Sequence, residues 1–223
     1  MKMKLNRVFW LLSFLFVVMF AGNAFAVLYE LPTSSFQGGA WNGESTYTDN
    51  GFQVLLQYAV YDTLSGNEWV NDGGYEAPGD RRYIYAYQVF NANSATQDIG
   101  YLKLFGAEGS TLTGGEISGL GSQKDPTNDQ FPEQGKKPFS GEFDDTNKEI
   151  VWKFLNFGGD FGVIGLAQQS YFLIYSSNNA PVMGNYKIEG PPSEGDAPIQ
   201  TPEPATIVLF GTGGLILLRK LRK

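Results

Sequence analysis

The sequence contains no cysteine and no histidine, and these two absences exclude most of the chemistry by which proteins act as catalysts. Without cysteine there is no disulfide, so packing and strand pairing must supply the stability of the fold. Cysteine nucleophiles, Ser-His-Asp triads, thiolate or imidazole zinc sites and haem ligation by these two residues are all excluded. Only carboxylate, lysine, serine and tyrosine chemistry remains, and we expect a protein that is not an enzyme.

Basic residues are scarce in the long middle of the chain. Of the sixteen lysines and arginines, three lie in the first 26 residues and four in the last five, which leaves nine against all twenty-three acids. The segment 27–218 therefore carries a net charge of −14, whereas the whole chain carries −7. This charge disfavours binding to nucleic acid or to an anionic membrane surface.

A convincing amphipathic helix is also missing between residues 27 and 200, where runs of β-branched and aromatic residues occur instead. Two runs, 52–61 and 83–90, are long and largely apolar, and we expect them to be central strands. Further strands are expected at 99–105, 150–157, 161–166, 171–176 and 185–188. The sequence predicts an all-β fold, a single antiparallel and jelly-roll-like β-sandwich, with a long loop at 119–141 and helices only at the ends.

The first 26 residues have the composition of a secretory signal peptide. Three basic residues precede an almost wholly apolar helical run at 8–20, and Ala24 and Ala26 then form the small-x-small pattern of a signal-peptidase site. We expect signal peptidase to remove this segment, so that the mature protein begins at Val27. The alternative is an uncleaved N-terminal anchor.

The C-terminal segment has three parts. Its residues are the triplet Pro202, Glu203 and Pro204, an uncharged apolar run at 205–218, and a basic cluster with Arg219, Lys220, Arg222 and Lys223. Fourteen residues form a helix of roughly 21 Å, which is short of the ~30 Å hydrocarbon core of a bilayer. We expect a short transmembrane helix whose basic end stops export, while the prolines keep the triplet extended outside the membrane.

This order of parts resembles the PEP-CTERM sorting signal of bacterial surface proteins. The resemblance implies a Gram-negative host, a transient stay in the inner membrane, cleavage at or near the triplet by an exosortase, and a final place at the cell surface or in the extracellular matrix. Blocks at 61–67, 83–91, 152–154 and 170–181 are similar to poorly characterised ectodomains of such proteins. The alternative is an ordinary C-terminal anchor that happens to follow a Pro-Glu-Pro triplet.

The predicted organisation is a signal peptide at 1–26, a β-sandwich ectodomain at 27–189, a Pro-rich linker at 190–201 and the sorting signal at 202–223. We expect a structural or adhesive surface protein whose partners are signal peptidase, exosortase and the membrane. A carbohydrate-binding module for exopolysaccharide is the alternative. A secreted glycan-active enzyme comes third.

Acidic clusters are the candidate ligand sites. The segment 144–149 gathers oxygen ligands, and Asp125, Asn128 and Asp129 lie in the expected loop, so one hypothesis is a hard cation, Ca²⁺ first, and the other is a solvated turn. No other cofactor is expected. The candidate glycosidase pairs, whose carboxyl groups would have to lie ~5 to 9.5 Å apart, are Glu142 with Asp144 and Glu44 with Asp49.

Aromatic residues give a second set of candidates. Trp41 and Trp69 lie among Gly, Asn and Asp in expected loops, where exposed rings can stack on sugars or on a partner protein. Core burial is the competing interpretation. For Tyr83, Tyr85 and Tyr87 we expect packing across a sheet.

Overall fold

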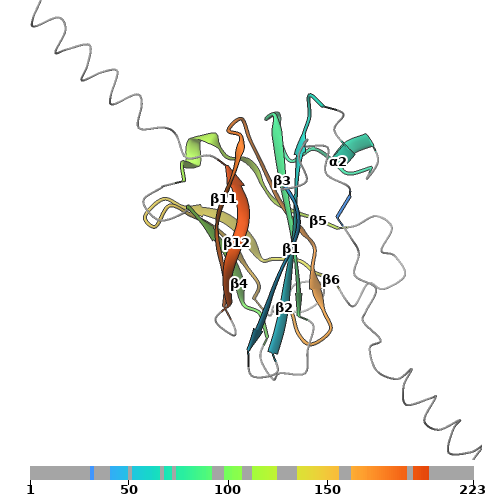
Figure 1. Cartoon of the computed structure of the whole chain (residues 1–223), viewed down its shortest axis with the longest axis vertical. Coiled ribbons are helices and arrows are strands. Elements are labelled where there is room, and N and C mark those ends of the chain that lie inside the picture. Colours follow the sequence, from blue (N-terminus) through green and yellow to red (C-terminus); the bar gives the residue numbers. More distant parts are fainter. Residues whose placement is uncertain are drawn as a thin grey trace, which may run out of the picture.

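A computed structural model describes ten stretches of the chain. They are residues 31–32, 41–49, 52–65, 68–71, 74–91, 98–106, 112–124, 135–155, 162–189 and 193–200. Within these stretches nearly all regular structure is β-strand, arranged in two sheets (Figure 1). The all-β class predicted from the sequence is therefore confirmed.

The first sheet has the strand order β1-β2-β3-β10-β5, with β9 and β6 attached beside β3. Its strands are β1 (Asn42–Asp49), β2 (Phe52–Asp62), β3 (Tyr83–Asn91), β5 (Ser118–Gln123), β6 (Gly135–Lys136), β9 (Gln169–Ser170) and β10 (Phe172–Ser177). Neighbouring strands are antiparallel except the short pair β6 and β9, which is parallel.

The second sheet is antiparallel throughout and has the order β12-β11-β4-β8-β7. Its strands are β4 (Tyr101–Phe105), β7 (Ser140–Asp144), β8 (Glu149–Lys153), β11 (Pro181–Glu189) and β12 (Ser193–Gln200). Figure 1 shows β11 and β12 side by side, facing the β1–β2 hairpin.

The main hydrophobic core lies between the two sheets. In β2 the alternate residues Val54, Leu56 and Val60 are buried there, because every second side chain of a strand points to the same face. The second sheet contributes Leu102, Leu104, Ile150, Trp152, Tyr186, Ile188, Ala197 and Ile199. Because each sheet buries one face against the other, the fold is β-sandwich-like.

The outer face of the first sheet is also partly covered. All nine residues of β3 are buried, so both faces of this strand are covered. On the outer side Ile84 and Phe172 pack with Trp69 of the short helix α2 (Glu68–Asn71), and the Trp69 indole N–H donates to the Glu76 carbonyl at 2.9 Å. Figure 1 shows α2 on the side of this sheet away from β11 and β12. The fold thus has a second, smaller core.

Buried tyrosines tie the first sheet to β12. The rings of Tyr85 and Tyr175 stack with centroids 4.6 Å apart, as expected for aromatic side chains on paired strands. The Tyr87 hydroxyl donates to the Pro198 carbonyl, and the Tyr175 hydroxyl accepts a hydrogen bond from the Gln200 backbone N–H at 3.2 Å. Burial raises the pKa of Tyr87 well above its usual value, so this hydroxyl stays a neutral donor. These two hydrogen bonds hold the C-terminal end of β12 against the first sheet.

The expected Pro-rich linker at 190–201 is wrong for residues 193–200, which form β12. The folded β domain accordingly extends to Gln200 instead of ending at 189. Proline lacks a backbone donor and is tolerated on edge strands. Because β12 is an edge strand, Pro198 fits there. Composition alone suggested a linker, but Pro198, Ile199 and Gln200 are all buried.

Three further expectations need correction. The loop at 119–141 contains most of β5, all of β6 and the start of β7. Helix is not confined to the ends, because α2 and the 3₁₀ turn η1 (Gly114–Glu116) lie between strands. Of the strand expected at 161–166, the described part forms only a bridge between Ile164 and Ile99. Within the first sheet β1, β2 and β3 are consecutive antiparallel neighbours.

Both predicted terminal segments lie outside the described residues, including the signal-peptide site at Ala24 and Ala26 and the apolar run 205–218. Within the described stretches, no helix has the length and hydrophobicity needed to cross a bilayer.

An ion pair fixes the turn that follows β2. The Asp62 carboxylate, 4% exposed, accepts hydrogen bonds from the Arg82 guanidinium at 3.1 and 2.8 Å and from the Leu64 backbone N–H at 3.0 Å. The hydrogen bonds from Arg82 are the main cause of the lowered pKa of Asp62. The folded state therefore binds this proton less readily than the unfolded state does.

We expect Asp62→Asn to lower the free energy of unfolding at pH 7 by about 1 kcal/mol, because the half-exposed partner Arg82 limits the value of the pair. A carboxyl group whose pKa is lowered in the folded state stabilises the fold at pH values above its ordinary pKa of 3.8. This contribution is lost as the pH falls through the pKa of the folded state. The difference in the free energy of unfolding between the native protein and the variant should therefore become smaller at acidic pH. Urea titrations at pH 7 and pH 3 measure this difference. The control is Asp145→Asn in the exposed β7–β8 turn. If the difference between native protein and Asp62→Asn is the same at both pH values, the prediction is wrong.

Candidate functional site

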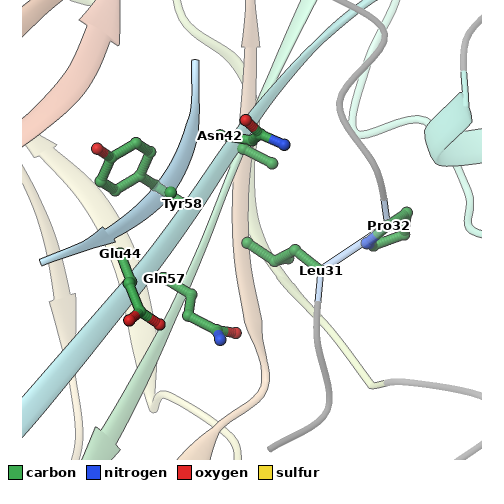
Figure 2. A pocket seen from close by; sticks show the side chains of 8 residues that line it. Leu31, Pro32, Asn42, Glu44, Gln57 and Tyr58 are labelled. Atoms are coloured by element: carbon green, nitrogen blue, oxygen red, sulfur yellow. The ribbon is translucent and has the colours of Figure 1, made fainter. Parts of the chain in front are cut away.

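A small surface pocket lies beside the β1–β2 hairpin, and we call it the β1–β2 pocket. It has a volume of about 220 Å³ and is lined by Leu31, Pro32, Asn42, Gly43, Glu44, Gln57, Tyr58 and Ala59 (Figure 2). Most of the lining comes from two paired strands, and the rest comes from the segment 31–32.

The strand register explains why the polar side chains meet. Glu44 of β1 lies opposite Gln57 of β2, and Asn42 lies opposite Ala59. The Ser45 hydroxyl approaches the Tyr186 hydroxyl of the second sheet at 2.9 Å, so Ser45 faces the interior. Because side chains alternate along a strand, the side chains on either side of Ser45 face outward. Figure 2 shows the Glu44 carboxylate next to the Gln57 amide.

A hydrogen bond places the apolar wall of the pocket. The Tyr61 hydroxyl donates to the Pro32 carbonyl at 2.6 Å, which holds the segment 31–32 against the outer face of β2. Leu31 also packs against the smaller core around Trp69. The pocket therefore combines a fixed apolar edge with polar strand side chains.

Buried acceptors without partners occur at this face. The Gln57 side-chain oxygen lines the pocket side of β2, is buried and has no hydrogen-bond partner in the described structure. Its cross-strand neighbour Gln88 has the same feature, although the Gln88 amide N–H donates to the Ser170 carbonyl at 3.2 Å. A buried acceptor without a partner is costly, and one beside a pocket is a candidate ligand contact.

The charge of the pocket comes from Glu44, because the Tyr58 side chain lies on the other face of β2, against the main core. Glu44 is an exposed carboxylate and the single acidic side chain among the described lining residues. The pocket can thus accept hydrogen bonds from a ligand but offers little attraction to an anion.

The acidic segment 144–149 forms the turn between β7 and β8. The Asp144 carboxylate accepts hydrogen bonds from the backbone N–H groups of Thr146 at 2.9 Å and Asn147 at 3.1 Å, and from the Asn147 amide at 2.8 Å. The bonds from Asn147 are the main cause of the lowered pKa of Asp144. This geometry matches the solvated-turn interpretation. Asp125, Asn128 and Asp129 lie outside the described residues, and the described part contains no cluster of three potential metal ligands.

The structure does not place the described candidate glycosidase pair, Glu142 and Asp144, on facing walls of a cleft. Glu142 and Asp144 lie on the same strand, β7, where Glu142 pairs with Lys153 of β8 and Asp144 binds its own turn. Glu44 lies in β1 and lines the β1–β2 pocket, while Asp49 is the last residue of that strand. Glu44 is therefore the one of these acids that lines the β1–β2 pocket.

The aromatic candidates are mostly core residues. Trp69, Tyr85 and Tyr87 are completely buried, and Tyr83 is 6% exposed, which confirms the packing expected for the tyrosines. Trp41 is partly buried against the main core. None of the five therefore offers a fully exposed ring for a ligand.

The sorting residues named from the sequence are not among the described residues. They are Pro202, Glu203, Pro204, Arg219, Lys220, Arg222 and Lys223. The sequence-based reasoning, in turn, missed Leu31, Asn42 and Gln57 as pocket residues. The one local sequence pattern that pointed to this site was the alternation of polar residues in β1. The pocket itself forms through pairing between strands, which the sequence of a single strand does not show.

Comparisons with known proteins identify no relative: no protein-family model matches the sequence, and searches of curated proteins and of solved structures also found no match.

Proposed function

We propose that this chain is an exported bacterial surface protein that is sorted and processed through its C-terminal segment and has a structural or adhesive role. The proposal rests on one observation: residues 202–223 contain, in this order, the Pro-Glu-Pro triplet, the apolar run and the basic cluster. Signal peptidase removes residues 1–26, and an exosortase cuts at or near the triplet. The mature domain then resides at the surface or in the extracellular matrix of a Gram-negative bacterium.

The folded part of the chain supports this proposal. β12 ends at Gln200, and Pro202 begins the triplet two residues later. The sorting segment therefore follows the last strand directly, without the spacer that the composition suggested. A β-sandwich-like domain stabilised by packing alone suits a chain that is secreted without disulfides.

The test replaces Pro202, Glu203 and Pro204 with alanine in a chain that carries a tag in the ectodomain. The proposal requires export of the variant to continue, because the apolar run and basic cluster are intact, while an uncut form accumulates in the membrane fraction. Cell fractionation and mass spectrometry of the mature C-terminus measure both effects.

The control variant replaces Pro191 and Pro192 with alanine, which removes two prolines and leaves the triplet intact. It should be processed like the native protein. If the triplet variant reaches the surface with the same mass and yield as the native protein, the segment is an ordinary anchor and the sorting proposal is wrong.

The second candidate function is carbohydrate binding. It is favoured by the β1–β2 pocket, in which Asn42, Glu44 and Gln57 place amide and carboxylate groups beside the apolar residues Leu31 and Pro32. Such a mixture of a few polar groups and an apolar wall is common in small-molecule sites. This role is compatible with sorting to the surface, because the two functions use different parts of the chain.

A further inference from the structure

We propose that the β1–β2 pocket binds a single neutral sugar unit, with Asn42, Glu44 and Gln57 as its hydrogen-bonding residues. The inference deepens the carbohydrate-binding candidate and rests on that role alone, so it is independent of sorting. The site consists of the cross-strand pair Glu44 and Gln57, the small residue Ala59 and the apolar edge formed by Leu31 and Pro32.

The polar groups match the hydroxyls of a sugar. The ionised Glu44 carboxylate only accepts hydrogen bonds, whereas the amides of Asn42 and Gln57 both donate and accept. Neighbouring hydroxyls on a sugar ring also donate and accept, so they can satisfy both kinds of group together. The Gln57 side-chain oxygen is buried and has no partner in the described structure, so a turn of the Gln57 amide toward the pocket would let this oxygen accept a hydrogen bond from a sugar hydroxyl.

The size and walls of the pocket limit the ligand. Its volume of about 220 Å³ is below the roughly 300–1,000 Å³ of pockets for drug-sized molecules, which favours a single ring. Ala59 lies opposite Asn42 and leaves room between the larger side chains. Leu31 and Pro32 offer an apolar edge to the C–H groups of a ring, and the Tyr61 hydroxyl holds that edge in place at 2.6 Å.

The charges favour a neutral ligand. The Glu44 carboxylate repels an anionic sugar, and the net charge of −14 over residues 27–218 adds to that repulsion. A calcium site requires six to eight oxygen ligands, usually with several carboxylates. Among the described lining residues Glu44 is the single carboxylate, so a neutral sugar fits better than a cation.

The experiment titrates the full-length protein, in a zwitterionic detergent that contains no sugar, with glucose, galactose, N-acetylglucosamine and the neutral glucan dextran. Saturation-transfer difference NMR should show saturable binding of at least one monosaccharide, with a dissociation constant on the order of 1 mM for so small a ligand. Dextran separates binding of free sugar from binding of the same unit within a polymer. A parallel titration with Ca²⁺ tests the cation directly.

Two variants test the assigned residues. Glu44→Gln keeps the shape and removes the charge, and we expect about tenfold weaker sugar binding because a charge-assisted hydrogen bond is lost. Gln57→Leu removes a buried acceptor without a partner, so the fold should keep its thermal midpoint while binding falls by about tenfold. A merely structural Gln57 would leave binding unchanged.

The matched control is Glu142→Gln, which changes another exposed glutamate, in β7 of the second sheet, and should bind sugar like the native protein. The assignment is overturned if no sugar saturates, if Ca²⁺ binds in place of sugar, or if both pocket variants bind with native affinity. Each of these results leaves the sorting proposal intact, because that proposal is tested by the location and mass of the triplet variant.

Discussion

A chain that ends before β12, with residues 193–223 deleted, should fail to fold, whereas a chain that lacks only residues 201–223 should fold as stably as the native domain. Both truncations remove the proposed sorting signal, so they differ only in β12. The comparison therefore isolates the contribution of this strand. Far-UV circular dichroism and urea unfolding, with the two purified chains at equal concentration, measure the difference.

The expected effect is large because β12 completes the main core. Ala197 and Ile199 are fully buried, and truncating one buried isoleucine side chain to alanine already costs about 2–5 kcal/mol. The deletion also removes eight residue pairs with β11 and the bonds that Tyr87 and Tyr175 make to Pro198 and Gln200. Together these losses are comparable to the ~5–15 kcal/mol that stabilises a typical domain. Equal urea midpoints for the two truncations would show that β12 is dispensable.

The second large effect is expected at Gly119 in β5, which has a φ of +61°. A Cβ atom at this position would overlap the backbone carbonyl group of Pro78. Backbone atoms cannot rotate away as a flexible side chain can, so Gly119→Ala must displace the segment around Pro78 or the strand itself. We expect a loss of about 3 kcal/mol or more, the sum of a strained backbone angle and a steric clash.

Gly74 provides the matched control. Its φ is +67°, and no described atom beyond the glycine and its two chain neighbours lies within 4 Å of the place that a Cβ would occupy. Gly74→Ala therefore carries only the backbone penalty of about 1–2 kcal/mol. The difference between the two urea midpoints reports the clash alone, and equal midpoints would contradict the close approach between Gly119 and Pro78.

The sequence predicted the strands whose own residues carry the signal. β2 and β3 are long runs of β-branched and aromatic residues, and both are central strands of the first sheet. β1 and β12 escaped prediction because they are edge strands. β1 is largely polar, and β12 contains glycine, proline and acidic residues, so each depends on a partner strand for its conformation.

The candidate site could not be predicted for a related reason. Glu44 and Gln57 meet through the register of β1 on β2, and a shift by one residue would turn one of them to the other face. Leu31 and Pro32 reach the pocket because the Tyr61 hydroxyl holds the Pro32 carbonyl and Leu31 packs against the smaller core. The burial of Trp69 likewise depends on Phe172, which lies about a hundred residues further along the chain. Such contacts are properties of the folded molecule and have no local sequence pattern.

The position of β12 in the sequence also determines the order in which the sandwich can be assembled. A ribosome makes a chain from its N-terminus, and β12 follows every other described strand, so it is the last of them to become available. Until it arrives, one edge of β11 is unpaired and the interior beside Tyr175 is open on that side. During that interval a β12 strand from a second molecule would fit the same edge, so exchange of the final strand between nascent copies is the characteristic assembly error that this topology permits.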